Sequence, residues 1–468
     1  MAKTRKTSRA QSRRRRPSIR FTAASEPPIS TAQVSSSVEE LLLAALTRAD
    51  TPETTGRYLV TFKEGAGPQA AKSLKAEGLR MADTRDFDGQ RASLEALGDA
   101  DAVLFPEVGV ALIGGPAAAE RSSLAESVER DADSPIASVD PEYFVFADNY
   151  FDPRVAGGGM STGYQGTTDA LRTAARILEV IAREIGGGAS GAVAEQQEEI
   201  AALGVTWGLS ACRVPASTRS GTGIKVAVLD TGMDLGHPDF AGRSVLSAQF
   251  VGQPVQDLHG HGTHCIGTAC GSKTPPGITP RYGIAFRSQI FAGKVLANSG
   301  GSVGASVLSG MNWAIANRCA VISMSLSGPG GPHPAYTAAG QAALNNGLLM
   351  IAASGNASSP AGAPANSPTI MSVASLDSNL APSSFSNHGK IDIAGPGRDI
   401  FSSWIRPTRY RTISGTSMAT PHVAGCAALW AESSPSLRGT SLWDRLRSSS
   451  RTLPFPPARV GAGLVQAP

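Results

Sequence analysis

The chain has 468 residues, of which 41% are hydrophobic and 17% charged, with 52 glycines and a formal net charge of +4. This composition is typical of a compact, loop-rich α/β protein with material for more than one domain, and it excludes coiled-coil and fully disordered chains. Nine of the 42 basic residues and no acidic ones lie in residues 1–20, so the remainder is mildly acidic, with 33 basic against 38 acidic residues.

Residues 1–55 are rich in Ser, Thr, Pro and Arg and are predicted to form a basic, disordered tail with one short helix around 38–48. Such a tail could bind nucleic acid or an acidic membrane surface, although a solvated arm is the more ordinary interpretation. No apolar run follows the basic residues closely enough for a signal peptide, and none reaches membrane-spanning length. We therefore expect a cytoplasmic or non-classically exported protein without a transmembrane segment.

Residues 56–147 show the pattern of a small α+β domain with βαββαβ order. Alternating and apolar runs predict strands, and longer amphipathic runs predict helices packed on one antiparallel sheet. The expected strands are 57–62, one within 99–105, 108–113 and 143–147, and the expected helices are 67–78 and 117–129.

Residues 148–204 differ in composition from both neighbours. Glycine-rich stretches flank a helical pattern in which Leu171, Leu178 and Ile185 share one face. This segment is interpreted as a linker with a helical insertion. It could serve either as a connector that holds a cleavage site or as a helix that packs on a neighbour.

Residues 205–468 alternate short apolar runs with helical stretches such as 303–317 and 335–346. Near-continuous apolar runs are typical of strands buried on both faces, and their alternation with helices predicts a doubly wound, mostly parallel sheet with helices on both faces. Reactive residues are then expected at the carboxyl ends of the strands. The expected strands are 224–230, 289–296, 320–326, 348–354 and 369–375.

Four polar positions stand at the ends of these elements. Asp230 closes the first strand, HGHGTH follows at 259–264, Gly355-Asn356 ends a buried strand, and Ser417 begins an apolar helix within SGTSMATPHVAG. Each residue alone could be a cap, a turn residue or an ordinary buried polar group. Together, and each at the end of a strand or helix, they indicate a catalytic group.

Asp, His and Ser supply the parts of an activated nucleophile. A serine hydroxyl needs a base within hydrogen-bond reach, and histidine, whose pKa lies near neutrality, is the usual one. An aspartate fixes the imidazole tautomer and stabilises the imidazolium. The Asn356 amide and the Ser417 N–H could donate to the oxyanion that forms during attack on a carbonyl.

These segments resemble those of the subtilisin-like serine proteases (subtilases), in family order. The resemblance covers about 205–467 and implies that the first histidine of HGTH, His261, is the base, that Asp230 orients it, that Ser417 attacks and that Asn356 holds the oxyanion. His264 is then a structural neighbour. The segments concerned are VAVLDTGMDLGHPDF, HGTHCIG, AGKVL, SMSLSGP, AASGN, SFSNHG, SGTSMATPHVAG and VGAGLVQA.

The family binds substrate as an added antiparallel strand. The resemblance implies that one edge is formed by Ser325, Leu326, Ser327 and Gly328 and the other by Ser299, Gly300 and Gly301. It also implies that Ala352, Ala353 and Gly362 line the pocket for the side chain before the cleaved bond.

Three departures from the family pattern bear on these expectations. Ser327 stands where the family often has glycine, which could alter the fit of the substrate. Cys265 follows HGTH as in the proteinase K branch and is interpreted as a small buried hydrophobe. Residues 270–283 lack the Asn-rich loop that holds calcium in many subtilisins, so we name no metal ligands, leave structural calcium elsewhere open and expect no cofactor for the chemistry. The five cysteines indicate no disulfide framework.

Residues 56–147 resemble the inhibitor-type propeptide of subtilases, which implies that the chain is a zymogen whose own prodomain is an intramolecular inhibitor. A serine endopeptidase acting on proteins or peptides through an Asp-His-Ser triad and an acyl-enzyme is the function that this resemblance implies. The alternative is a catalytically latent binding or chaperone-like module with the same fold. A binding module does not need Asp230, His261, Asn356 and Ser417 together, and their presence favours the enzyme.

Overall fold

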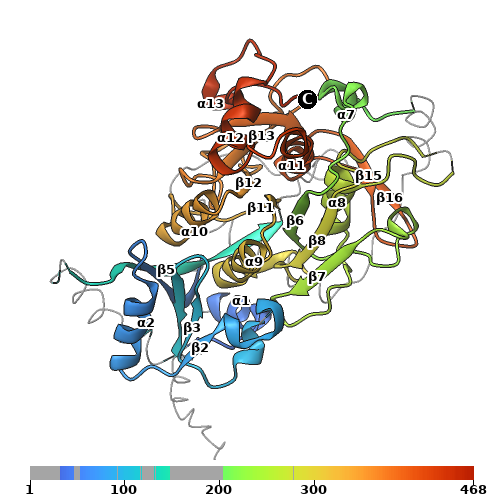
Figure 1. The fold of residues 1–468 in the computed structure, drawn as a ribbon. Coiled ribbons are helices and arrows are strands. Elements are labelled where there is room, and N and C mark those ends of the chain that lie inside the picture. Colours follow the sequence, from blue (N-terminus) through green and yellow to red (C-terminus); the bar gives the residue numbers. More distant parts are fainter. Residues whose placement is uncertain are drawn as a thin grey trace, which may run out of the picture. The chain divides into compact units, whose positions relative to one another are not determined.

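The computed structural model describes residues 32–46, 53–115 except 92, residues 118 and 131, 133–147, and 204–468 except 278 (Figure 1). The basic residues 1–20, the helix predicted at 117–129 (118 apart) and nearly all of the predicted linker 148–204 lie outside the described residues. None of the helices in the described ranges has the length and apolar character that crossing a membrane requires.

A seven-stranded sheet lies at the centre of the C-terminal region, with strand order β14-β13-β12-β10-β6-β8-β7. Every neighbouring pair in it is parallel, which confirms the predicted sheet. Its strands are β6 (Lys225–Asp230), β7 (Val245–Gln249), β8 (Gln289–Lys294), β10 (Val321–Met324), β12 (Leu349–Ala353), β13 (Met371–Leu376) and β14 (Ile393–Pro396).

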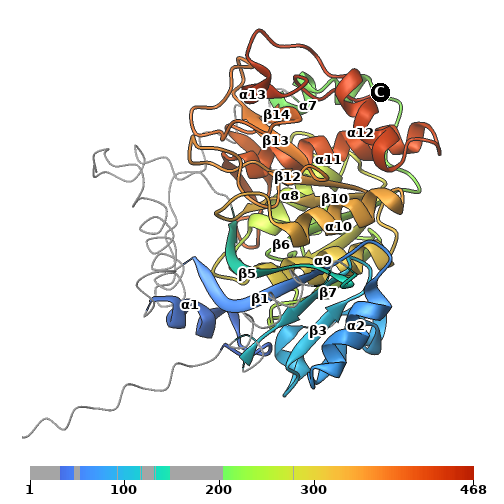
Figure 2. The ribbon, with the colours of Figure 1, turned by 90° about the vertical axis from the view of Figure 1, so that its left-hand side faces the viewer.

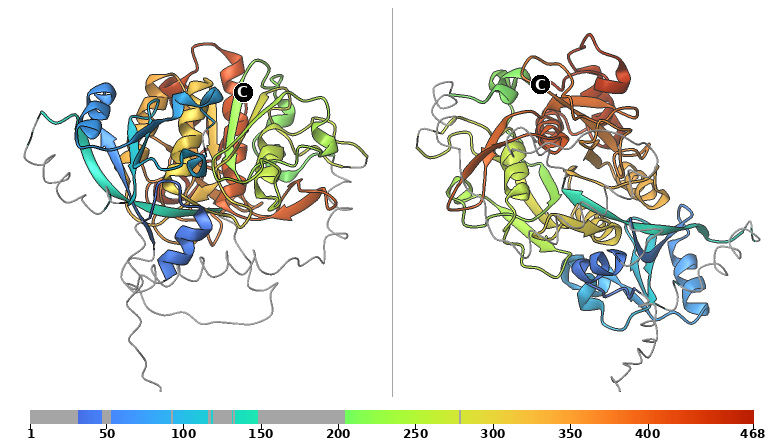
Figure 3. Two further views of the ribbon diagram at one scale, coloured as in Figure 1. Left: turned by 90° about the horizontal axis from the view of Figure 1, so that it is seen from below. Right: turned by 180° about the vertical axis from the view of Figure 1, so that it is seen from behind.

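Helices cover both faces of this sheet because alternate residues of each strand point to opposite sides. Ala227 and Leu229 of β6 share an apolar cluster with α9 and α10, whereas Val226 and Val228 share a second cluster with α8 and α11 (Figures 1 and 3). The helices are α7 (Trp207–Ala211), α8 (His261–Cys270), α9 (Gly304–Ala316), α10 (Pro334–Asn345), α11 (Thr416–Ser433), α12 (Gly439–Ser448) and α13 (Pro457–Val460). The doubly wound architecture is therefore confirmed.

The N-terminal region forms its own mostly antiparallel sheet with the order β5-β1-β4-β3-β2, in which only β2 and β3 run parallel. All four predicted strands and the first predicted helix are present. The elements are β1 (Thr54–Phe62), α2 (Gly67–Ala76), β2 (Met81–Asp83), β3 (Ala102–Phe105), β4 (Val110–Ile113) and β5 (Ile136–Ala147), with short 3-10 turns at Thr84–Asp86, Asp88–Gln90 and Leu94–Leu97.

Part of the predicted tail is ordered and packed, which corrects the expectation of disorder for residues 32–46. The short helix expected there is α1 (Val38–Leu46), and its start carries a capping box in which Ser37 and Glu40 exchange backbone-to-side-chain hydrogen bonds. Val38, Leu41 and Leu42 are buried. Their spacing gives the helix one apolar face, and burial of that face outweighs the polar composition of the segment.

The end of β5 leaves the N-terminal sheet and lies between two strands of the C-terminal region. Figure 2 shows β5 beside β1, to which it pairs over most of its length. Its last residues then pair antiparallel with β9 (Gly301–Val303) on one side and β11 (Leu326–Ser327) on the other. Residues 31–468 accordingly form one compact unit.

Candidate catalytic site

Asp230 and His261 meet at the carboxyl end of β6. Asp230 is the last residue of this strand and His261 the first of α8, and their side chains are 1% and 0% exposed. Asp230 Oδ1 lies 2.7 Å from His261 Nδ1. A carboxylate can only accept, so Nδ1 carries a proton, and in the neutral imidazole Nε2 is the acceptor.

The environment of His261 sets its protonation. Burial is the largest single influence and would lower the pKa of His261. The charge of the Asp230 carboxylate, together with contributions from Cys265 and the hydrogen bond to Asp230, raises the pKa overall, to well above 6.5. The imidazolium is therefore stabilised where it would form during proton transfer.

Ser417 is the second residue of α11 and is fully buried. Its hydroxyl donates to the carbonyl oxygen of Ser325 at 3.1 Å, and Ser325 Oγ donates to the carbonyl of Ser417 at 2.7 Å. In the part of the chain that the structure describes, His261 Nε2 has no hydrogen-bond partner. The Asp–His contact is thus formed, while the serine hydroxyl is directed to a backbone carbonyl.

Asn356 is held by the residue that precedes Ser417. Its amide oxygen accepts from the Thr416 N–H at 2.8 Å and from the Thr416 hydroxyl at 3.0 Å. Because the oxygen end of the amide is occupied in this way, the NH2 end is the one directed elsewhere. Thr416 was not predicted from the sequence, although a threonine directly before the serine at a helix start is the signal that could have indicated it.

Asp257 supports the turn that leads to His261 and was also missed from the sequence. Its carboxylate is fully buried and accepts from the N–H groups of His259 and Gly260 at 2.9 and 2.8 Å and from the Thr263 hydroxyl at 2.8 Å. Gly260 has φ of +100°, and a Cβ there would collide with Trp404. The carboxylate and the glycine together fix the position of His261.

His264 and Cys265 lie beside this group in buried positions. Burial lowers the pKa of His264 to about 3, and its Nε2 lies 3.0 Å from the carbonyl oxygen of Ile400. The Cys265 sulfur lies 3.9 Å from His261 Nδ1 and 3.6 Å from the carbonyl oxygen of Ser417. Burial raises the pKa of Cys265, so it is a neutral thiol at physiological pH.

The two edges that the sequence indicated for substrate carry the end of β5. Phe146 pairs with Gly301 on one side and with Ser327 on the other, and Ala147 pairs with Leu326. The Ala147 N–H donates to the carbonyl oxygen of Gly300 at 2.8 Å. The expected edge residues therefore already bind a strand of this same chain.

The remaining predicted residues lie around these edges. The Ser299 hydroxyl accepts from the Gly301 N–H at 3.4 Å. Gly328 exchanges two backbone hydrogen bonds with Ala363, and Gly362 donates to the carbonyl of Ser354. Ala352 and Ala353 are the last two residues of β12, and Ala352 belongs to the apolar cluster that includes α9 and α10.

The Ser327 side chain lies between two glycines. A Cβ placed on Gly362 would be 3.5 Å from the Cβ of Ser327, and one placed on Gly355 would be 3.6 Å from its hydroxyl oxygen. Because Ser327 stands where the family often has glycine, it adds a polar side chain between Gly355 and Gly362.

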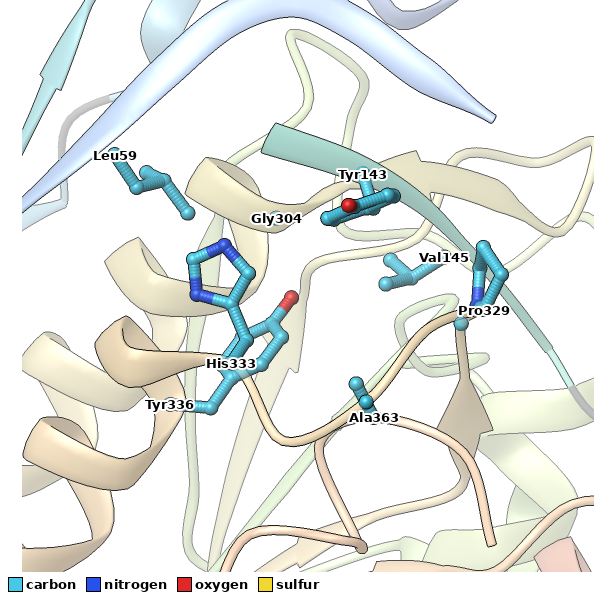
Figure 4. Close-up of a pocket in the computed structure, with 10 residues that line it drawn as sticks. Leu59, Tyr143, Val145, Gly304, Pro329, His333, Tyr336 and Ala363 are labelled. Atoms are coloured by element: carbon cyan, nitrogen blue, oxygen red, sulfur yellow. The ribbon is translucent and has the colours of Figure 1, made fainter. Parts of the chain in front are cut away.

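A mostly apolar pocket lies beside the end of β5, and its walls come from both regions (Figure 4). His333 lines this pocket, and each of its ring nitrogens makes a hydrogen bond. Nδ1 accepts from the Ala335 N–H at 3.2 Å, and Nε2 donates to the carbonyl of Pro141 in β5 at 3.1 Å. The residues labelled in the figure are Leu59, Tyr143, Val145, Gly304, Pro329, His333, Tyr336 and Ala363.

Comparisons with known proteins identify the family and the fold. Residues 221–463 match the model of the subtilase family, Peptidase_S8. Subtilisin Savinase from Lederbergia lenta is 38% identical over 275 residues, which are 57% of this chain and 98% of that protein. An alkaline protease from Alkalihalobacillus alcalophilus is 38% identical over 284 residues, 58% of this chain and 72% of that protein. The crystal structure of a cold adapted subtilisin-like serine proteinase is 33% identical with a TM-score of 0.50, covering 56% of this chain and 98% of its own.

Proposed function

Because the chain belongs to the subtilase family and is a serine endopeptidase, we propose that it cleaves peptide bonds through Asp230, His261 and Ser417 and that it is made as an inactive zymogen. The observation that supports the catalytic part of this proposal is the buried contact between Asp230 and His261, at 2.7 Å, beside the start of α11. Subtilases need no cofactor for this chemistry, so side chains and backbone groups supply every step.

In the acylation step, Ser417 Oγ attacks the carbonyl carbon of the substrate and its proton passes to His261 Nε2. The tetrahedral intermediate collapses as the carbon–nitrogen bond breaks, and His261 returns the proton to the leaving amine. Water, activated by the same nitrogen, then hydrolyses the acyl-enzyme. For these steps to occur, the Ser417 hydroxyl must turn from the carbonyl of Ser325 toward His261 Nε2 by rotation about its side-chain bonds.

The developing oxyanion would be held by the Asn356 NH2 group and by the Ser417 N–H at the start of α11.

We expect Asn356→Ala to lower kcat by about 10²–10³-fold with little change in KM, the loss known for the corresponding asparagine of subtilisin. Steady-state hydrolysis of a chromogenic peptide by the processed enzyme would measure this, with Asn346→Ala, an exposed position, as the control. A loss confined to KM would contradict the assignment.

The zymogen part of the proposal rests on the end of β5. A substrate that binds as an added strand needs the edges of β9 and β11, and residues 144–147 already pair with both. We therefore assign residues 56–147 as the inhibitory prodomain, residues 148–204 as the connector and residues 205–468 as the catalytic domain. Continuing the register by one residue would bring the chain opposite Ser325, so we expect self-cleavage within the first residues after Ala147.

The substrates are expected to be proteins or peptides with an apolar side chain at the position that Val145 takes in β5. Val145 pairs with Ser302 and lines the apolar pocket with Tyr336 (Figure 4). A substrate strand in the same register would take the place of β5. It would put a side chain where Val145 lies, against the part of this lining that comes from the C-terminal region, such as Tyr336 and Gly328.

Intact mass and a serine-directed phosphonate probe, applied to the same purified full-length chain, test the proposal. We expect a break near residue 148, followed by labelling at Ser417 that peptide mapping locates. A chain that stays whole and unlabelled even after the prodomain has been cut away by an added protease would instead favour a latent binding or chaperone-like module. Labelling of a different serine would refute the assignment of the nucleophile.

A further inference from the structure

Residues 32–46 precede the prodomain and pack against both regions of the molecule. Helix α1 lies beside β1 (Figure 2) and also contacts β9. Its apolar face belongs to the same buried cluster as the end of β5, which lies in the cleft between β9 and β11. The members of this cluster that matter here are Val34, Val38, Leu41 and Leu42 of the segment, Phe144 and Phe146 of β5, and Val303 of β9.

The N-terminal sheet leaves space for this segment to pass. Gly114 follows β4, and a Cβ there would lie 2.6 Å from the backbone nitrogen of Val34. The neighbouring Gly115 N–H donates to the carbonyl of Ala32 at 2.7 Å. A side chain at position 114 would push the segment away, so the glycine permits the close backbone approach.

A buried charged network links the segment to the catalytic domain. Arg57 is fully buried, and its Nη1 donates to the carbonyl of Val34 at 2.8 Å. The same guanidinium makes two hydrogen bonds to Glu142, at 2.7 and 3.1 Å. Glu142 in turn accepts from the Ala305 N–H at 2.7 Å, in the first turn of α9. The segment thus supplies a hydrogen-bond acceptor, the carbonyl of Val34, to the buried guanidinium of Arg57. Without the segment, this buried cation would lose that partner.

A second bridge runs from α1 to the wall of the cleft. Gln253 Nε2 donates to Glu39 Oε1 at 3.1 Å, and Gln253 Oε1 accepts from the Asn298 N–H at 2.8 Å. Asn298 lies two residues before Gly300, whose carbonyl oxygen accepts from Ala147. Gln253 therefore links helix α1 to the loop that binds Ala147, the last residue of β5.

We propose that residues 32–46 are a latch that holds the end of β5 in the cleft and sets how fast the prodomain leaves after cleavage. The inference rests on the proposed zymogen function. It extends the inhibitory part of the chain to a segment upstream of the prodomain sheet, and it means that activation requires both the cut after β5 and the release of α1.

The double variant Leu41→Ala/Leu42→Ala in the full chain tests the latch, with Leu43→Ala on the exposed side of the same helix as the matched control. We expect the interval between self-cleavage and the appearance of peptidase activity to shorten by about tenfold or more, since two buried contacts of the bound fragment are lost. Native mass spectrometry should show the cleaved fragment leaving sooner. An unchanged interval together with unchanged retention of the fragment overturns the proposal.

Two further measurements separate the latch from folding and from catalysis. Glu39→Ala leaves the apolar face intact and removes the carboxylate that accepts from Gln253, so it provides the test if the leucine variant does not fold. In the Ser417→Ala chain, which is expected to remain uncut, hydrogen exchange in residues 144–147 and 301–303 should be faster in the latch variants. If wild type is never cut, the self-cleavage part of the proposed function fails, while this exchange still tests the latch. Unchanged exchange in the latch variants would overturn the latch.

Discussion

Ser417→Ala is expected to stop both self-cleavage and peptide hydrolysis, with a loss of roughly 10⁶-fold in kcat, the magnitude known for subtilisin when its nucleophile is removed. A methyl group cannot attack the carbonyl carbon, so the variant lacks the nucleophile. The full-length alanine variant should therefore keep its mass under conditions in which wild type breaks near residue 148. Binding of substrate and of the prodomain should be preserved, because the substitution removes only one oxygen atom.

Intact mass and hydrolysis of a mixed peptide library would measure both effects. Ser436→Ala, at an exposed position after the end of α11, is the matched control and should behave as wild type. Wild-type rates of self-cleavage in Ser417→Ala would mean that another residue, or a contaminating protease, makes the cut. That outcome would refute the assignment of Ser417 even if the fold is as described.

The parallel sheet of the catalytic domain could be predicted where each strand is a continuous apolar run. Strands β6, β8, β10, β12 and β13 have this pattern. Strand β7 was missed because only Ala248 is buried, and β14 because four residues with a glycine and a proline make no recognisable run. The hairpin of β15 (Ile400–Ser403) and β16 (Tyr410–Ile413) was missed because its strands are short.

The members of the candidate site could be predicted because they lie at or just beyond the ends of recognisable elements. Asp230 ends β6, His261 begins α8 and Ser417 is the second residue of α11. Asn356 lies in the loop that follows β12. The residues that hold these members in position could not be predicted from the sequence. Asp257 accepts from backbone N–H groups, and Thr416 donates its own N–H and hydroxyl to the side-chain oxygen of Asn356. Such contacts have no sequence pattern of their own. The direction of the Ser417 hydroxyl depends on the nearest carbonyl, that of Ser325, which is 92 positions away in the chain.

The packing of residues 32–46 could not be predicted for a related reason. Composition indicated a solvated tail, whereas the ordering of this segment depends on partners far away in sequence, such as Gly114, Arg57 and Gln253. The short helix itself was expected, because the spacing of Val38, Leu41 and Leu42 is local. What the sequence did not indicate was the surface on which this apolar face is buried.

Asp230→Asn is expected to lower kcat by about 10⁴-fold and to move the pH dependence of activity to lower pH. The amide keeps the size of the carboxylate, but it no longer fixes the imidazole tautomer in which Nε2 accepts the proton of Ser417. It also removes the charge that raises the pKa of His261, so burial remains and the pKa falls.

The sign of the pH shift follows from the protonation state that the base requires. His261 must be neutral to accept a proton, so wild-type activity rises as the pH increases through its raised pKa. In Asp230→Asn the pKa is lower, and the rising part of kcat/KM against pH should lie at lower pH than in wild type. Asp444→Asn, an exposed position on α12, should change neither the rate nor the profile.

The measurement needs processed protein, which a variant of low activity does not make by itself. Tagged wild type added in trace amount can cut the variant and then be removed, and Ser417→Ala treated in the same way gives the background rate. If Asp230→Asn lowers kcat but leaves the pH profile unmoved, Asp230 does not control the pKa of His261 through its charge, and its contribution reduces to orientation of the ring. If neither quantity changes, the 2.7 Å contact between the two side chains is not part of the catalytic group, and the proposed mechanism must be given up.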